Sequence, residues 1–367
     1  MKRLAMVIPL IVAFTAYLTL KPVPIAPNAW QAPAAPGYTG VHAANTRLQG
    51  LHQIDLHGEV GPEHVVMGPD GKLYTGVESG NILRMQHDGS GQEVFCNTGG
   101  RPLGMAFDAD GKLIVADAYK GLLSVTADGS VSVLLGMAEG GPLHFPDAVV
   151  VAKNGNIYLS DSSTRFSPRL WGSTTEAAML DIFEQSSTGR VLEYQPASKE
   201  VRVVAEGLSF SNGIVLSSDE TALFISESGK YRVWKIAVAA RQLELNRSIP
   251  QLTPLASIVF DNLPGYPDNL TRGQDGKIWL GLAGQRNFLD FTAERPYLRS
   301  MALRIPRMLW KMPPSYGHVI AFQEDGKVIA DLQDPSGDSP TVTGVTETAN
   351  RLYIHNVNGK GLGWMAR

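Results

Sequence analysis

The sequence predicts an all-β protein, a six-bladed β-propeller with a central channel, to which an N-terminal membrane-anchor helix and a short helical insertion are added. Three observations predict this architecture. A hairpin phrase recurs along the chain, oxygen-bearing side chains stand at the same point of its copies, and an uncharged apolar run opens the sequence. With 367 residues, 44% of them hydrophobic, the chain is long enough to bury the core that such a fold needs.

The first residues form a unit of their own. Lys2 and Arg3 precede a run from Leu4 to Leu20 that contains no charged side chain. This run lies at the short end of what spans a bilayer but is longer than most signal-peptide cores, so residues 1–21 are expected to be a signal anchor. Residues 22–45, rich in Pro and Ala, are expected to be an extended tether. The positive-inside rule then places the remainder on the extracytoplasmic side, periplasmic or luminal, whereas cleavage after the run would release a secreted protein.

The recurring phrase predicts the propeller over residues 46–367. Residues 62–74, PEHVVMGPDGKLY, return forty residues later at 102–114 as PLGMAFDADGKLI. Further copies run over residues 146–155, 211–220 and 267–276, and a degenerate sixth ends at 350–353. Each copy is a short apolar strand, a tight turn and a second strand, which is a hairpin signal. Six copies fit radial four-stranded blades, whereas the alternative, two β-sandwich domains, would not place one phrase at the same point of each unit.

Larger gaps after the third, fourth and fifth copies predict insertions at about 164–188, 238–258 and 286–318. The last insertion mixes apolar residues such as Met308 and Trp310 with several arginines, a pattern typical of short amphipathic helices, broken here near Pro306. Two interpretations stand side by side. The insertion is either a helix pair packed over a blade edge or a lid on the channel mouth that also touches anionic lipid headgroups.

Composition excludes several classes of function. The formal net charge of -3 leaves no basic excess for gripping a phosphate backbone, so no nucleic-acid partner is expected. Cys96 is the single cysteine, which rules out a disulfide framework and any multi-thiolate metal site. The chain contains no nucleophile-elbow, phosphate-loop, dinucleotide or zinc-protease pattern, so neither a serine hydrolase nor a nucleotide-binding protein is indicated.

The start of the first strand in each copy supplies the candidate site, because in a propeller these starts converge near one mouth of the channel. The equivalent positions are Glu63, Leu103, Asp147, Asn212, Asp268 and Val342, and Asn269 adds a further oxygen donor. Three carboxylates cannot share a narrow channel unpaired without a large desolvation and repulsion cost, which a cation would remove. Ligation by oxygen alone favours calcium over zinc or copper. The alternative is that these residues merely cap strand starts, but their shared register favours a metal site.

Four phrases carry a resemblance to a known family: Gly61–Glu63, Phe210–Ile214, Leu263–Asn269 and Leu289–Pro296. They are similar to the strictosidine synthase-like family, most closely to its adipocyte plasma membrane-associated branch, and the likeness covers nearly the whole chain. The resemblance implies a six-bladed propeller with calcium in its channel, as in paraoxonases, squid-type phosphotriesterases and gluconolactonases. It also implies arylesterase or lactonase activity.

Carried over position by position, the calcium ligands of that superfamily match Glu63, Asn212, Asp268 and Asn269, and Asp147 stands where an asparagine is usual. Three departures limit what the resemblance implies. True strictosidine synthases use a glutamate on the last blade, where the equivalent stretch of this chain has Thr341, Val342 and Thr343. Leu103 replaces a paraoxonase histidine, and Phe145 aligns with an arginine of sugar lactonases. A true strictosidine synthase, or a histidine-assisted or sugar-directed mechanism, is therefore not expected.

Together these features predict a calcium-dependent hydrolase of small apolar esters or lactones. Calcium would polarise the carbonyl oxygen, and Asp268 is the candidate nucleophile or general base. His64 and His144 are predicted to flank the mouth, as proton shuttles or as side chains that support the ligands. The alternative is a non-catalytic, calcium-stabilised module that binds a ligand or a protein at the membrane; a third class, a structural membrane scaffold, would need no metal.

Overall fold

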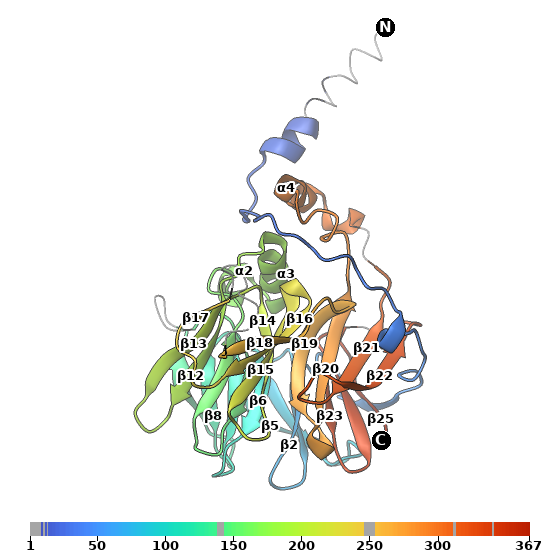
Figure 1. Ribbon diagram of the computed structural model, residues 1–367. Helices are drawn as coiled ribbons and strands as arrows, with labels where there is room; N and C mark the ends of the chain where they lie inside the picture. The colour runs from blue at the N-terminus through green and yellow to red at the C-terminus, as the bar shows by residue number, and fades with distance from the viewer. Residues whose placement is uncertain are drawn as a thin grey trace.

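The computed structural model describes residues 9, 12, 14–137, 143–245, 254–310, 313–339 and 341–367. Within these residues, six largely antiparallel sheets are arranged in sequence order, and the first strand of each sheet packs against the first strand of the next (Figure 1). The contacts run once around the molecule and return from the last sheet to the first. The predicted all-β six-bladed propeller is therefore confirmed.

Each blade is built from strands that are close in the sequence. The first blade contains β2 (Val65–Met67), β3 (Leu73–Gly76), β4 (Asn81–Met85) and β5 (Glu93–Asn97), and the second contains β6 (Pro102–Phe107), β7 (Leu113–Asp117), β8 (Gly121–Val125) and β9 (Val131–Gly136). The third contains β10 (Pro146–Val151), β11 (Ile157–Asp161), β12 (Gly189–Gln195), β13 (Glu200–Leu208) and the short parallel strand β17 (Leu243–Glu244). The fourth contains β14 (Ser211–Leu216), β15 (Ala222–Glu227), β16 (Arg232–Ala237) and β18 (Ala256–Phe260), and the fifth contains β19 (Gly265–Arg272), β20 (Ile278–Gln285), β21 (Gly317–Phe322) and β22 (Val328–Asp334).

The sixth blade joins the two ends of the chain. It contains β23 (Val342–Glu347), β24 (Arg351–Asn356) and β25 (Gly361–Ala366), and its outer strand is β1 (His52–Asp55). Strand β1 pairs antiparallel with β25, with His52 opposite Trp364 and Asp55 opposite Gly361. Main-chain hydrogen bonds therefore close the ring, and Cys96 remains a free, buried thiol.

The innermost strands β2, β6, β10, β14, β19 and β23 line the channel, and two glycines show how closely they approach one another. A Cβ atom on Gly104 of β6 would lie 2.5 Å from the Cα atom of Ala148 in β10. A Cβ atom on Gly213 of β14 would lie 2.2 Å from the amide nitrogen of Leu270 in β19. Neither position accepts a larger residue without moving a strand.

Helices gather at one end of the propeller. The first predicted insertion contains α2 (Pro168–Trp171) and α3 (Thr174–Glu184), and the last contains α4 (Pro296–Arg304) and the 3₁₀ turn η4 (Arg307–Leu309) (Figure 1). Ser173 caps α3, since its hydroxyl accepts a hydrogen bond from the Glu176 amide at 3.0 Å. Pro306 separates α4 from η4, as predicted. Three further 3₁₀ turns are η1 (Gly40–His42), η2 (Ser228–Lys230) and η3 (Gln274–Gly276).

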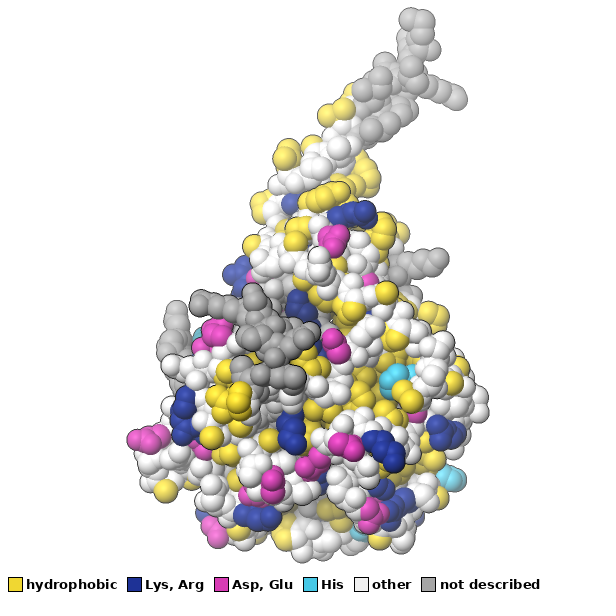
Figure 2. Space-filling model, in the orientation of Figure 1, with side chains coloured by type: hydrophobic (Ala, Val, Ile, Leu, Met, Phe, Trp, Pro, Cys, Tyr) yellow, Lys and Arg dark blue, Asp and Glu magenta, His cyan; other side chains and the backbone are white. Residues whose placement is uncertain are grey.

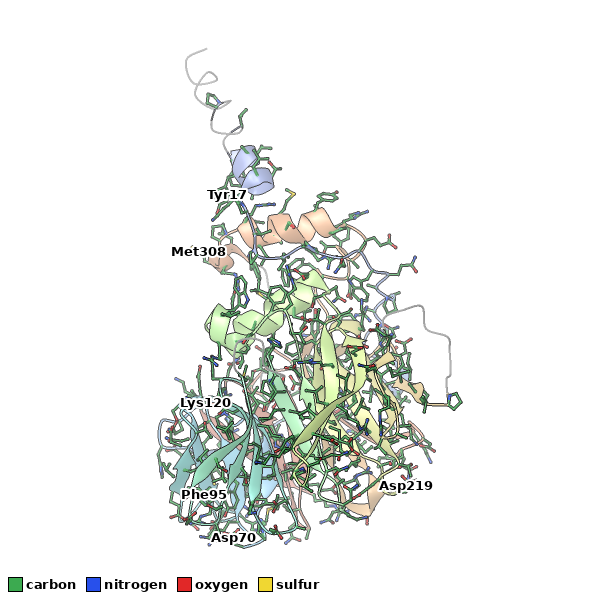
Figure 3. The ribbon with its side chains drawn as sticks, turned by 90° about the vertical axis from the view of Figure 1, so that its left-hand side faces the viewer. Tyr17, Asp70, Phe95, Lys120, Asp219 and Met308 are labelled. Carbon is green, nitrogen blue, oxygen red and sulfur yellow. The ribbon has the colours of Figure 1, made fainter. Side chains whose placement is uncertain are left out.

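The two ends of the propeller differ in what covers them. Figure 3 places Tyr17 and Met308 at the end that carries the helices, and Asp70 and Asp219, which belong to hairpin turns, at the opposite end. The insertion predicted at 238–258 contains β17 and the start of β18, and its residues 246–253 lie outside the described residues. The helix-covered end is therefore opposite the end formed by these hairpin turns.

The N-terminal run is described only in part. Residues 14–20 are helical, and among the described residues no helix is both long and apolar enough to cross a bilayer. Residues 1–8, 10, 11 and 13 lie outside the described part of the chain. The anchor over residues 1–21 therefore stays a prediction.

Residues 22–39 are extended and lie against the propeller (Figure 1), and η1 follows them; the tether over residues 22–45 stays a prediction. The Asn28 amide donates to the Glu184 carbonyl at 2.8 Å, and the Trp30 amide donates to the Ala293 carbonyl at 3.1 Å. The Pro/Ala-rich composition does not reveal this docking, because its contacts join segments that are far apart in the sequence.

Candidate metal and active site

A pocket of about 370 Å³ opens at the helix-covered end of the channel. Its wall contains four of the predicted ligands, Glu63, Asp147, Asn212 and Asp268. The rest of the wall is largely apolar and comes from inner strands, from α3 and from the two flanks of the last insertion, with Leu103, Phe145, Ile182, Phe210, Tyr266 and Pro314 among its residues. The pocket thus joins a group of oxygen donors to a hydrophobic chamber.

The repeat brings these side chains together through a bulge that recurs in successive blades. The pairing of β10 with β11 shifts register between Pro146 and Val149, and β14 with β15 shifts between Ser211 and Ile214. Blades two, five and six carry the same irregularity near the start of their inner strands. A bulge leaves residues unpaired and re-aims their side chains, which explains why Asp147 and Asn212 reach the pocket.

Neighbouring side chains hold two of the carboxylates in place. Asn269 Nδ2 donates to Glu63 Oε1 at 2.6 Å and lies 3.2 Å from the Glu63 carbonyl oxygen. Ser162 Oγ donates to Asp147 Oδ2 at 2.9 Å. Asn269 is buried and does not line the pocket, so the structure places it beside Glu63 as a support, while Glu63, Asp147, Asn212 and Asp268 face the pocket.

Three of the pocket oxygens have no hydrogen-bond donor among the described residues. They are Glu63 Oε2, Asn212 Oδ1 and Asp268 Oδ1, and each is buried. Burying an unpaired acceptor costs free energy, more so when it is charged. Carboxylate and amide oxygens from separate blades are the ligands that calcium prefers, so the residues present fit this ion.

The channel carboxylates are not fully drawn together around one point. Taken with one oxygen each, they do not form a group whose ligand atoms all lie within 4.8 Å of one another, whereas the described residues contain such a group elsewhere. Oxygens that bind one calcium ion lie at most about 5 Å apart, so binding by all three carboxylates requires their side chains to move closer. Calcium takes six to eight oxygens, so amides and water would complete its shell.

Burial raises the pKa of all three channel carboxyl groups. The pKa of Asp147 is raised to about 8, first by burial and then by the nearby charge of Glu63. The pKa of Asp268 lies well above its ordinary value for the same two reasons, with repulsion from Asp147 added. For Glu63, burial raises the pKa while the Arg101 charge and the Asn269 hydrogen bond oppose it. Without a cation the site therefore retains protons near neutral pH, and a bound cation must displace them.

Arg101 is a site residue that the sequence did not reveal. It is only 4% exposed, and its Nη1 donates to the Gly61 carbonyl oxygen at 3.1 Å, two residues before Glu63. Its charge lowers the pKa of Glu63 and Asp147, so it favours their ionised, cation-binding form. Arg101 occupies the position of Gly61 in the next copy of the repeat, and nothing in the phrase marks it as functional.

The two predicted histidines do not line the pocket. His64 is buried and contributes to a second hollow lined by the inner strands, where its ring meets His355 edge to face at 5.3 Å. Its Nδ1 accepts from the Met105 amide at 3.2 Å, and burial lowers its pKa to about 4. Consecutive side chains of an extended chain point to opposite sides, so Glu63 and His64 diverge, and the expectation that His64 flanks the mouth was wrong. His144 is half-buried beside the pocket residue Phe145, with its amide bonded to Asp161.

The ring of six sheets and the oxygen-lined pocket define the class: this is a six-bladed β-propeller with a candidate cation site in its channel. Solved structures of the same architecture include a gluconolactonase from Xanthomonas campestris, with a TM-score of 0.58, 20% identity and coverage of 95% of this chain and 98% of that chain. A calcium-binding regucalcin from Agrobacterium tumefaciens aligns with a TM-score of 0.56 and 14% identity, over 86% of this chain and 93% of that one. At such identities the likeness shows the fold alone.

The chain belongs to the strictosidine synthase-like family. A strictosidine synthase-like N-terminal model matches residues 40–85, and a strictosidine synthase model matches residues 147–240. An adipocyte plasma membrane-associated protein of Salmo salar is 32% identical over 359 residues, which cover 90% of this chain and 80% of the relative. Protein strictosidine synthase-like 6 of Arabidopsis thaliana is 34% identical over 275 residues, or 73% of this chain and 67% of the relative.

Proposed function

We propose that the protein is a calcium-dependent hydrolase of carboxylic esters or lactones and that the reaction takes place in the helix-covered pocket. The observation that carries this proposal is the set of three buried oxygens, from Glu63, Asn212 and Asp268, that have no donor among the described residues and belong to a largely apolar pocket. A solved structure of the same fold is named a gluconolactonase, that is, an enzyme that hydrolyses a lactone, which adds support.

The pocket residues would bind the ion, activate the nucleophile and contact the substrate. When bound, calcium would supply a Lewis acid for the substrate carbonyl oxygen. Glu63, Asp147 and Asn212 would hold the ion from three different blades. Asp268 presents a carboxylate to the pocket, and its raised pKa suits a group that accepts a proton from water near neutral pH or attacks the carbonyl carbon itself.

The apolar walls set the class of substrate. Leu103 and Phe145 stand beside the ligands, and Phe210 packs edge to face on Phe145 at 5.3 Å. These side chains offer no hydrogen bonds to hydroxyl groups, so the part of a sugar that lies against them would lose its water contacts without replacement. An aryl or alkyl ester, or a lactone with an apolar substituent, fits the pocket better.

The direct test is hydrolysis of phenyl acetate and of a panel of aliphatic and sugar lactones by the purified, calcium-loaded protein. We expect turnover of the aryl ester and the aliphatic lactones, its loss on treatment with a calcium chelator, and its return when calcium is restored. Sugar lactones should be poor substrates. A fully calcium-loaded protein without turnover on any of these compounds would contradict the proposal and favour the non-catalytic binding module.

We also propose that the helix-covered end faces a membrane, with residues 1–21 as the anchor and the propeller on the extracytoplasmic side. Relatives are named plasma membrane-associated proteins. Figure 2 shows hydrophobic side chains gathered around the N-terminal helix and just below it. Met308 is 89% exposed and Leu309 68% exposed, although both are large apolar residues. Exposed apolar side chains on a short helix next to an anchor are typical of a surface that enters the interfacial region of a bilayer.

The last insertion also shows which of its residues serve packing. Trp310 stacks on Phe183 of α3 at 5.4 Å, and Arg299, only 1% exposed, donates to the Phe183 carbonyl oxygen at 2.8 Å. Arg304 donates to the Lys21 carbonyl oxygen at 2.5 Å and so fixes the end of the N-terminal helix. The last insertion, with α4 and η4, therefore packs over α3 and the N-terminal segment. Met308 and Leu309 take no part in this packing and would be free to contact the membrane.

A chain lacking residues 1–21 tests this surface without the anchor. It should sediment with anionic liposomes, and Met308→Ser with Leu309→Ser should weaken that binding about tenfold, because two inserted apolar side chains are lost. The matched control is Val94→Ser with Val133→Ser, two exposed apolar residues of outer strands, which should bind like the parent. Equal binding by both double variants would leave α4 and η4 as packing alone.

A further inference from the structure

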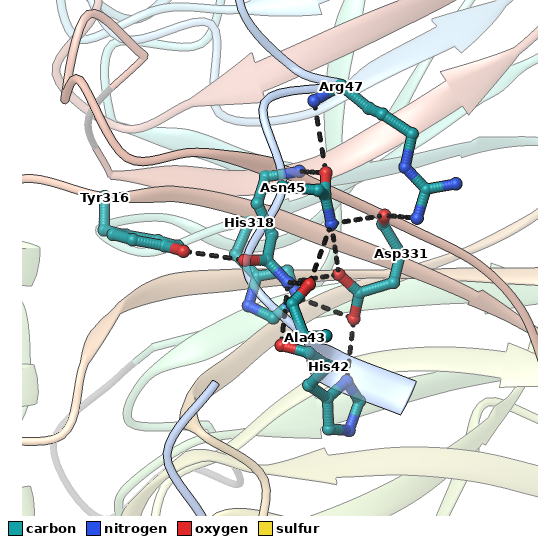
Figure 4. Close-up of polar contacts among 8 residues, drawn as sticks. His42, Ala43, Asn45, Arg47, Tyr316, His318 and Asp331 are labelled. Carbon is teal, nitrogen blue, oxygen red and sulfur yellow. Dashed lines mark hydrogen bonds and ion pairs between the residues drawn. The ribbon is translucent and has the colours of Figure 1, made fainter. Parts of the chain in front are cut away.

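A second group of metal-type side chains lies outside the channel. His42 comes from η1 in the N-terminal segment, and His318 and Asp331 come from β21 and β22, adjacent strands of the fifth blade (Figure 4). In the pairing of these strands His318 lies opposite Gln333, two residues from Asp331, so both side chains share one face of the sheet. The N-terminal segment crosses this face and adds His42.

The three side chains converge on one point. His42 Nδ1 lies 2.7 Å from Asp331 Oδ2, and His318 Nε2 lies 3.0 Å from the same oxygen. One ligand atom from each residue can be chosen so that all lie within 4.8 Å of one another. The side chains of His318 and Asp331 are 2% and 3% exposed, and that of His42 is 13% exposed. The site is therefore nearly closed, with access to solvent only on the His42 side.

Surrounding amides hold the carboxylate. Asp331 Oδ1 accepts from Gln333 Nε2 at 2.5 Å and from Asn45 Nδ2 at 3.4 Å, which leaves Oδ2 for the two imidazoles. Tyr316 in turn donates to Gln333 Oε1 at 2.6 Å. Outer contacts of this kind orient the ligands of a metal site and fix their distances. In contrast to the channel, this site is already assembled by neighbouring polar groups.

One atom of the group is unpaired. His318 Nδ1 is buried and has no hydrogen-bond partner in the described part of the chain. The Asp331 carboxylate can only accept, so His318 carries its proton on Nε2, and the lone pair of the buried Nδ1 has no donor among the described residues. A divalent metal would displace the protons between the two imidazoles and Asp331, so that His42 Nδ1 and His318 Nε2 bind the metal directly. Two imidazole nitrogens with one carboxylate oxygen are a donor set that zinc and similar divalent transition metals prefer, and that calcium does not.

We propose that His42, His318 and Asp331 form a binding site for a divalent transition metal of the zinc class, which fastens the N-terminal segment to the fifth blade. Water on the exposed side of His42 completes a four-coordinate shell. The two sites would then select different metals: the oxygen donors of the channel suit calcium, and the nitrogen donors at the fifth blade suit a zinc-type metal. The site also reaches the pocket indirectly, since Tyr316 lines the pocket wall and stacks on Tyr38 of the N-terminal segment at 4.4 Å.

The test is a titration of the metal-free full-length chain with Zn²⁺ against a chromophoric chelator, repeated with Co²⁺ to record its visible absorption bands. We expect about one equivalent of tightly bound Zn²⁺ and Co²⁺ bands typical of a four-coordinate site. His42→Gln should weaken Zn²⁺ binding by at least about 100-fold, because a direct ligand is lost. His52→Gln replaces an exposed histidine of β1 and should bind Zn²⁺ like the parent. Glu63→Gln, in the channel, should also leave Zn²⁺ binding unchanged.

A second readout does not depend on the stability of the variants. The Arg47–Leu48 bond lies five residues after His42, and trypsin cannot cut earlier in the segment after Lys21, which Pro22 follows. Zn²⁺ should slow tryptic cleavage at Arg47 in the parent and in His52→Gln, but not in His42→Gln. If the parent binds no Zn²⁺ beyond what His42→Gln binds, or if Zn²⁺ leaves cleavage at Arg47 unchanged, the three residues form only a hydrogen-bonded clasp and the proposal fails.

Discussion

Asp268→Asn is expected to lower ester or lactone turnover by about 100- to 10,000-fold while calcium stays bound. The amide keeps the shape of the side chain and a hard oxygen for the ion, but it neither accepts a proton at neutral pH nor attacks a carbonyl carbon. The measurement is kcat on the best substrate of the panel, with the calcium content of the same preparation determined by elemental analysis.

The matched control is Asp275→Asn, in the same blade, whose side chain is 77% exposed and distant from the pocket wall. It should leave both kcat and calcium content unchanged. Turnover of Asp268→Asn within a few-fold of the parent would contradict the assignment of Asp268 as base or nucleophile. Loss of calcium together with activity would restrict Asp268 to holding the ion.

Removal of calcium is expected to lower the melting temperature by about 5 °C or more at pH 8, because an ion bound from several blades stabilises the folded ring by linkage. The effect should shrink as the pH falls toward 6. In the ion-free protein the pKa of Asp147 is about 8, against about 3.9 in an unfolded chain. Between these values the folded state holds more protons than the unfolded state, so the ion-free protein loses stability as pH rises, and calcium restores it.

Calorimetric scans with and without chelator at pH 6, 7 and 8 check this. The expected result is that the calcium-dependent rise in melting temperature increases with pH and levels off above about pH 8. Glu63→Gln should reduce the shift at every pH, since a ligand from the first blade is lost. A shift independent of pH, or none at all, would show that no ion binds between these carboxylates.

The ring and the oxygen-bearing residues of the pocket were predictable because the repeat encodes their positions directly. A phrase that occurs six times fixes the number of blades, and equivalent positions in it must meet around the axis. Glu63, Asp147, Asn212 and Asp268 do line one pocket, as the register indicated. The break of the last insertion at Pro306 followed from proline chemistry alone.

The remaining features depend on contacts between distant segments, which no local pattern reports. Arg101 acts through the carbonyl of Gly61, and Asn269 acts through a hydrogen bond to Glu63, 206 residues away. The side to which the His64 side chain points depends on the alternation of side chains along an extended strand. The repeat identifies equivalent residues but does not show to which side their side chains point. The group of His42, His318 and Asp331 spans nearly 300 residues, so its members look unrelated until the chain has folded.

The pairing of β1 with β25 decides the order in which the molecule can be made. Strand β1 is synthesised about 300 residues before its partner β25, residues 361–366. Until β25 is made, β1 has no strand to pair with and the edge of β24 that β25 covers stays open, which is a surface for wrong pairing. Insertion of β25 between β24 and β1 therefore completes the sixth blade, and a chain that stops before residue 361 leaves this blade with β23 and β24 alone.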